Sequence, residues 1–505
     1  MTDVRGRATG RGPAAPARPA PGVSVQWTGP LFRQLTGRRG DIAGFAGCAV
    51  RGPVGSALRL TGPAEFDAAY GPASAGSYLS AAVHGFFGNG GQVCWVQRAA
   101  HRAQAAEQVT ATPPFLTFTA TSPGTWANGL VIDLLPTGGE RFALTLTAPD
   151  GRREIWRDLA VATLAERFDP GAGSTSTMSA LVTAVAMPGT AVPVTPSRTV
   201  LTGGDDGLSG LTAAELADAA LFPDIPEIGL VAVPDLLLRQ SLTDPLPSYG
   251  PDEIAAAQGR LVSGCEELHD RTALLHHPDS GALADDVIAW RDRFSSAYAA
   301  VYWPWLAIVD PDRPGETRAV PPAGHVAGVI ARTELAGGPQ QPPANQIVTG
   351  VVGVTVPVDD ERHGQVNEGG VNAVRATAGR GIRLLGARTA SADPQWRYLN
   401  VRRLLDHIEL GIAAEAAWLV FEPNGPQLRD SLDRVIRQFL DDLWRAGGLD
   451  GATADEAYSV AVDDTDTAGD GRLIAEIGVL PPWPAEFVVV RIDVSERGAD
   501  HGRDG

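Results

Sequence analysis

Two short apolar segments lie near the two ends of the chain, and glycine or proline separates each from the nearest other element. The first, residues 23–27 (VSVQW), alternates apolar and polar residues and is followed by Gly29-Pro30. The second, residues 486–494 (EFVVVRIDV), follows the proline-rich run 481–484. An isolated β-branched strand promotes aggregation unless another strand pairs with it. These segments therefore either fold back onto a sheet of their own chain or add a strand to a neighbouring subunit, where backbone hydrogen bonds supply the affinity.

The chain between these segments predicts an α/β (α+β) fold, because strand-like and helix-like patterns alternate along it. Strand patterns at 41–50 and 92–98 flank a helical pattern at 77–87. Residues 105–200 hold short alternating stretches separated by Gly-rich turns, which is typical of a β-rich module. In the next α/β stretch, Thr212 and Glu215 form a capping box that begins a helix.

A length of 505 residues predicts about three domains. The segments are a disordered basic tail (1–22), an extended segment (23–40), an α/β part (41–104), a β-rich module (105–200), an α/β module (201–340), a second α/β part (341–484), a terminal strand (485–494) and a disordered tail (495–505).

Charge and composition exclude several classes of function. All 41 basic residues are arginine, so the chain has neither the lysine of a Walker P-loop nor one for Schiff-base chemistry. A formal charge of -18 argues against nucleic acid as a partner. The sequence has no run of about 18 apolar residues, which argues against a membrane span, and residues 1–22 lack the apolar core of a signal peptide. The three widely spaced cysteines are typical of synthesis in a reducing cytoplasm.

Three motifs weakly resemble phosphate-binding or metal-binding sites. Residues 203–207 (GGDDG) precede a helix but lack the lysine of a phosphate loop, so they predict a turn. Residues 464–469 (DTDTAG) resemble the start of a calcium loop, but the closing acid is displaced to Glu476, and an acidic surface turn is the simpler interpretation. His276-His277 lie near Asp279 without a third ligand, which favours a loop at the end of a strand. No cofactor and no enzyme follows from these motifs.

One basic stretch stands out in this acidic chain. Residues 371–405 contain one acidic residue, Asp393, and seven arginines: Arg375, Arg380, Arg383, Arg388, Arg397, Arg402 and Arg403. They form either an ordinary solvated face or a docking surface for the acidic face of another subunit, since a guanidinium binds carboxylates bidentately. Nucleic acid is the weaker alternative because no aromatic stacking platform accompanies them.

Residues 427–446 predict a long amphipathic helix. Its apolar residues recur with a period near 3.6: Leu428, Leu432, Val435, Ile436, Phe439, Leu440 and Leu443. Its polar face carries Arg429, Asp430, Asp433, Arg434 and Arg437.

Several stretches together resemble contractile tail sheath proteins, which occur in contractile phage tails and in phage-derived injection systems. They are 42–51 (IAGFAGCAVR), 85–98 (GFFGNGGQVCWVQR), 322–332 (PAGHVAGVIAR), 379–403 (GRGIRLLGARTASADPQWRYLNVRR), 418–424 (WLVFEPN), 471–479 (GRLIAEIGV) and 484–492 (PAEFVVVRI). The chain departs from the family where Thr377-Ala378 replace an aromatic-proline pair, and in its longer, more basic tail.

The resemblance implies an inner α/β domain built from 41–104 and 341–484, with 105–200 and 201–340 inserted on the outside. Terminal arms would pair with neighbouring subunits through Val23, Val25, Trp27, Phe487, Val488, Val489, Val490, Arg491 and Ile492. The polar face of the 427–446 helix would lie near an inner tube.

The implied function is structural: helical polymerisation around the tube and contraction from a metastable extended state. The implied partners are copies of the chain in stacked hexameric rings, the tube, a baseplate and a terminator or cap, with neither nucleic acid nor membrane insertion. Assembly would occur in the bacterial cytoplasm, as part of a phage tail or a phage-like particle. An α/β enzyme, either a hydrolase or a nucleotide binder with a decorated core, is the alternative.

Overall fold

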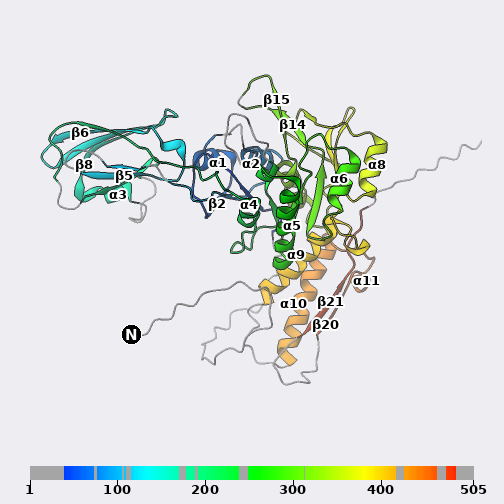
Figure 1. Cartoon of the computed structure of the whole chain (residues 1–505). Coiled ribbons are helices and arrows are strands. Elements are labelled where there is room, and N and C mark those ends of the chain that lie inside the picture. Colours follow the sequence, from blue (N-terminus) through cyan, green and yellow to red (C-terminus); the bar gives the residue numbers. More distant parts are fainter. Residues whose placement is uncertain are drawn as a thin grey trace, which may run out of the picture.

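A computed structural model describes residues 39–72, 77–104, 107–109, 115–169, 178–187, 191–237, 248–311, 313–416, 426–462 and 474–484 (Figure 1). Its centre is a nine-stranded sheet with the order β16-β19-β18-β13-β12-β11-β1-β3-β2. The strands are β1 (Ala43–Gly47), β2 (Ala57–Leu60), β3 (Cys94–Arg98), β11 (Leu230–Ala232), β12 (Thr272–Leu275), β13 (Ala299–Trp303), β16 (Gln346–Ile347), β18 (Asn372–Thr377) and β19 (Gly381–Leu385). The predicted α/β class is confirmed.

The six central strands, from β3 to β18, run parallel, whereas β2, β19 and β16 at the two edges are antiparallel to their neighbours. Parallel strands are covered on both faces, and β1 is buried along its whole length. Ile42 and Ala46 belong to one apolar cluster, and Ala43 and Phe45 to another, because successive side chains of a strand point to opposite faces.

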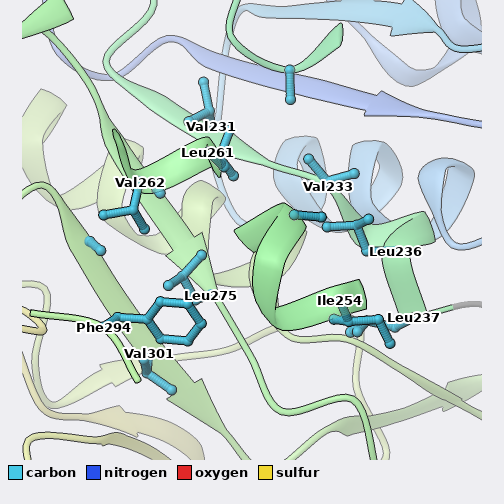
Figure 2. Packing of buried hydrophobic residues seen from close by; sticks show 14 of the residues in the cluster. Val231, Val233, Leu236, Leu237, Ile254, Leu261, Val262, Leu275, Phe294 and Val301 are labelled. Atoms are coloured by element: carbon cyan, nitrogen blue, oxygen red, sulfur yellow. The ribbon is translucent and has the colours of Figure 1, made fainter. Parts of the chain in front are cut away.

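Helices cover both faces of this sheet. One cluster includes buried residues of α4 (Ala213–Ala219), α5 (Pro251–Leu268), α6 (Ala284–Arg291) and α8 (Asp360–Glu368). The opposite cluster includes residues of α1 (Pro63–Tyr70), α2 (Leu79–Gly88) and α7 (Ala323–Gly337). Figure 2 shows part of the first cluster, where Leu261 of α5 lies near the apolar side chains of β11 and β12. The result is a three-layer sandwich.

The segment 201–340, predicted as an inserted module, contributes β11, β12 and β13 to the middle of this sheet. Its strands thus continue the sheet that β1 and β3 belong to. The sequence did not predict β13, which ends before Pro304, a residue without a backbone N–H. The next strand, β14 (Leu306–Val309), pairs with β15 (Thr317–Val320) and β17 (Gly353–Val354) in a separate sheet.

The described residues of 105–200 form mostly strands, and Figure 1 shows this part to one side of the central sheet. A four-stranded antiparallel sheet consists of β6 (Val131–Gly138), β7 (Arg141–Thr147), β8 (Arg153–Ala160) and β10 (Ser197–Val200). A three-stranded sheet consists of β4 (Glu107–Val109), β5 (Leu116–Ala120) and β9 (Val182–Ala186), and α3 (Ala165–Phe168) adds to their shared core.

The β-rich part is attached through Arg98, whose side chain is fully buried at the end of β3. Its guanidinium donates to the backbone carbonyls of Gly52, Pro123 and Asp206. Beside it, Gln104 and Asp205 pair where the chain enters and leaves the β-rich part. The capping box predicted at Thr212 and Glu215 is present at the start of α4.

The last described part consists of α9 (Leu399–Ala416), α10 (Pro426–Arg445), α11 (Ala454–Ala457) and the antiparallel hairpin of β20 (Tyr458–Val462) and β21 (Ala475–Val479). Figure 1 shows α10 and the hairpin side by side, extending away from the central sheet. The predicted helix 427–446 is confirmed within one residue at each end.

Asp235 joins three segments from inside the core. Its carboxylate accepts hydrogen bonds from the backbone N–H groups of Cys48 and Tyr78 and from the Ser77 hydroxyl. Burial raises the pKa of Asp235 to about 6, although these hydrogen bonds and Arg318 oppose the shift. The folded state therefore binds a proton more tightly than the unfolded chain, where an aspartate titrates near 3.9.

We expect the Asp235→Asn variant to become progressively more stable, relative to the parent, as the pH rises from 4 to 7. The stability that protonated Asp235 contributes is complete below the unfolded pKa and is lost as the pH rises through about 6. A difference of about two pKa units corresponds to roughly 3 kcal/mol in the free energy of unfolding. Chemical denaturation at several pH values measures the difference. Asp224→Asn, at an exposed position, is the control and should show no such trend.

Candidate assembly interface

The β20–β21 hairpin packs one face against α10. The apolar stripe of α10 buries Leu432, Ile436, Phe439 and Leu440, as its period predicted. These side chains form a core with Val460 of β20 and with the partly buried Ile477 of β21. Two strands alone are marginally stable in water, so α10 supplies the apolar face that holds this hairpin.

The register of the hairpin determines which backbone groups face outward. The backbone N–H of Leu480 donates to the carbonyl of Ala457, so these two opposed residues occupy a hydrogen-bonded position of the ladder. Such pairs alternate along an antiparallel ladder, so Val460 and Ile477, three positions further on, direct their backbone groups away from the partner strand. The outward positions are Tyr458, Val460 and Val462 on β20 and Ala475, Ile477 and Val479 on β21.

The two outer edges differ. Within the described residues, no hydrogen bond reaches the outward N–H and C=O groups of Ala475, Ile477 and Val479, and no further strand pairs with β21. On β20, the carbonyl of Val460 accepts a hydrogen bond from Arg437 of α10. An edge strand with unpaired backbone groups is a template for another strand.

The chain that follows β21 is fixed to the start of α9. The side-chain amide of Asn400 donates to the carbonyl of Pro482 over 3.3 Å. The rings of Tyr398 and Trp483 meet edge to face, with 5.5 Å between their centroids. Residues 480–484 therefore connect the hairpin to the start of α9. Sequence analysis did not identify these anchors, because the paired residues are more than 80 positions apart.

The predicted arm residues, Val23, Val25, Trp27, Phe487, Val488, Val489, Val490, Arg491 and Ile492, lie outside the described residues. The calcium-like motif 464–469 does too. Pairing by these segments therefore stays a prediction.

The prediction that Arg402 and Arg403 belong to an exposed basic face is wrong, because the side chains of both are almost fully buried. Arg402 forms an ion pair with Asp406 over 2.7 Å and lies over the ring of Trp396. Arg403 binds the carboxylate of Glu334 and the carbonyls of Gly40 and Gly229. These two guanidinium groups connect α9 to the central sandwich and are not available to a partner.

The other five arginines are partly or fully exposed. Arg375 forms an ion pair with Asp360, and Arg383 donates to the carbonyl of Asn345. Arg388 donates to the carbonyl of Asn367. Arg380, in the turn between β18 and β19, and Arg397 are exposed. A docking role for these five stays a prediction.

The polar face of α10 presents Asp430 and Arg434 to solvent. Arg437 instead binds Asp433 one turn earlier, with Nε 3.0 and 2.9 Å from the two carboxylate oxygens. Arg429 is partly buried. The proposed contact with a tube therefore depends on the exposed side chains of this face, above all Arg434.

The motifs with a weak likeness to enzyme or metal sites have structural roles where they are described. Asp206, in the GGDDG turn, accepts hydrogen bonds from the backbone N–H and the hydroxyl of Thr125. Burial lowers the pKa of His276 to about 3, which keeps the ring neutral in the core. The described residues include no group of three potential ligands placed to hold a metal ion. None of the described helices is both long enough and apolar enough to span a membrane.

Comparison with known proteins gives two adjoining family matches. Residues 261–390 match the phage tail sheath protein central domain, and residues 391–495 match the phage tail sheath C-terminal domain. The boundary lies just before Asp393, between the central sheet and α9.

Individual relatives agree. The tail sheath protein of Vibrio phage KVP40 is 27% identical over 191 residues, and that of Enterobacteria phage T4 is 25% identical over 192 residues. Each alignment covers 36% of this chain and 28% of the relative, so the chain spans about a quarter of the length of these relatives. The helical sheath of the anti-feeding prophage, solved in its contracted state, is 21% identical with a TM-score of 0.57 and covers 94% of this chain and 99% of its own. This last likeness concerns the fold.

Proposed function

The chain belongs to the phage tail sheath family, and from this premise we propose that it is a structural subunit of a contractile sheath. The subunits polymerise helically around an inner tube and contract from a metastable extended state, which drives the tube through a target envelope. The alternative of an α/β enzyme is set aside, since the family is structural and the described motifs have structural roles.

The β20–β21 hairpin is the observation that carries this proposal. Among the described residues nothing pairs with the outward backbone groups of β21, and the chain contributes the strand-like segment 485–494 that such an edge requires. Pro482 and Trp483 are fixed beside Asn400 and Tyr398 at the start of α9, and this attachment of the residues before the segment favours its addition to another copy. Residues 23–40 are the second arm of this proposal.

The energy of the arms fits a cooperative lattice. An arm strand forms about four to six ladder bonds, each with a net stabilisation of about 1 kcal/mol. One arm alone therefore holds a neighbour weakly, and the lattice gains its strength from many simultaneous contacts. Contacts of this kind that repeat head to tail without closing extend into a helix.

Contraction needs two packings of the same lattice. The arms act as hinges that maintain connectivity while the folded bodies rotate as rigid units. The extended packing persists around the tube until the sheath is released at one end. Each ring that changes to the contracted packing then favours the same change in the next ring. The difference in contact energy between the two packings drives the motion.

The partners proposed for this lattice are copies of the chain in stacked hexameric rings, the tube, a baseplate and a terminator or cap. Assembly takes place in the bacterial cytoplasm, and the product is a phage tail or a phage-like injection particle. Nucleic acid and membrane are not among the partners, in keeping with a formal charge of -18.

Negative-stain electron microscopy of the purified chain tests the proposal. We expect long striated tubes or stacked rings with a central channel. Discrete particles of monomer size at all concentrations would instead favour the enzyme.

In the presence of the tube protein, Arg434→Glu should lower the fraction of filled tubes, because this exposed side chain lies on the face proposed to meet the tube. Arg313→Glu, an exposed charge reversal before β15, is the control and should fill normally.

A further inference from the structure

Arg437 reaches from α10 to the outer edge of β20. Its Nη2 donates to the carbonyl of Val460, in the middle of the strand. Asp433 holds the same guanidinium through Nε. Both side chains are less than half exposed. The arginine is thus fixed between a carboxylate of its own helix and the backbone of the neighbouring strand.

The bonded carbonyl is one that an added strand would need. Val460 and Ile477 are opposite each other, and the register derived above turns the backbone groups of both outward. The carbonyl of Val460 is therefore central to any ladder formed on the β20 edge. A strand that paired there would have to displace the guanidinium. A charged side chain on an edge is a device that prevents unwanted pairing.

The β21 edge has no such cover within the described residues. The equivalent backbone groups at Ala475, Ile477 and Val479 accept and donate no hydrogen bond there. Those three side chains are partly buried on the side that faces α10, so an apolar strand added beside them would extend an existing apolar face.

We propose that Arg437 blocks the β20 edge, so that the hairpin accepts a strand from a second copy only at the β21 edge. The inference rests on the proposed function, in which that strand is the segment 485–494. In this segment Val488, Val490, Ile492 and Val494 alternate with residues that include Arg491 and Asp493. From Val488 onward one face of such a strand is apolar and matches the face of the hairpin covered by α10, and Glu486 is the one polar residue on that face, at its start.

Double-cysteine variants of the full chain test which edge is used. Ala461 and Glu476 are opposite each other on the two strands, and both are exposed. Ala461→Cys reports pairing at the β20 edge, and Glu476→Cys reports pairing at the β21 edge. Each is combined with Arg491→Cys and, to sample the other face of the arm, with Val490→Cys. The native Cys48, Cys94 and Cys265 are buried and do not compete.

After oxidation, we expect disulfide-linked dimers and ladders from the Glu476→Cys variants in at least tenfold excess over the Ala461→Cys variants. Arg437→Ala should reduce that excess to within about twofold, because the β20 edge becomes open. Arg445→Ala, on the same helix and exposed, is the matched control and should preserve the excess.

Equal yields from the two reporters in the parent chain would overturn the block, as would an excess that Arg437→Ala leaves unchanged. Disulfides found only within monomers would overturn the exchange of strands between copies, whichever edge they report. The absence of a disulfide from both reporters would overturn both proposals. Failure of the block is thus distinguishable from failure of the proposed function.

Discussion

Deletion of residues 485–494 is expected to abolish tube formation while leaving a folded, soluble monomer. The apolar clusters of the described structure consist of residues no later than Val479, and the chain is fixed to α9 by Pro482 and Trp483, before the deleted segment begins. Losing the segment therefore removes no described core contact. It removes one strand from every junction of the proposed lattice, so the loss multiplies along the polymer.

Electron microscopy and sedimentation measure the assembly, and circular dichroism measures the fold. Deletion of residues 495–505 is the matched control, since it shortens the chain by a similar length but retains the apolar strand. Tubes of normal length from the 485–494 deletion would contradict the arm. Loss of the fold in the monomer would show that the segment completes its own domain.

Arg403→Ala is expected to lower the free energy of unfolding by about 3–5 kcal/mol, the usual cost of removing one partner of a buried ion pair. The substitution leaves the carboxylate of Glu334 buried without its guanidinium, and it leaves the carbonyls of Gly40 and Gly229 without this donor. Three distant segments lose their common contact at once.

Chemical denaturation of the chain lacking residues 485–494 measures this change without interference from assembly. Arg397→Ala, from the same basic stretch but exposed, is the control and should change the free energy of unfolding by less than about 0.5 kcal/mol. Equal and small effects of the two substitutions would restore the interpretation of Arg403 as a surface residue.

Local patterns predicted local structure well. The apolar period of α10 gave its buried face, and the pairing of Thr212 with Glu215 gave the start of α4. In both cases the interacting residues lie within about one or two helical turns, so the sequence contains both partners at a readable distance.

Patterns that depend on distant partners were less informative. β13 is buried along its whole length, and a short apolar run of this kind has no period that separates it from a helix. The paired positions of β18 and β19 include Arg375 and Arg383, a pairing that the sequence analysis did not predict. The seven arginines were grouped by proximity in sequence, yet α9 turns two of them into the core.

By itself, the sequence determined the α/β class, the abundance of strands in 105–200, the long amphipathic helix and the resemblance to tail sheaths, because each depends on residue type and spacing along the chain. Only the tertiary structure decided that strands from 41–104, 201–340 and 341–484 form one sheet, that Arg403 is an internal contact, and that Arg437 covers one edge of the hairpin. These features depend on which distant groups meet. The sequence does not show which distant residue a charged group or a strand will contact, because that contact forms only when the chain folds.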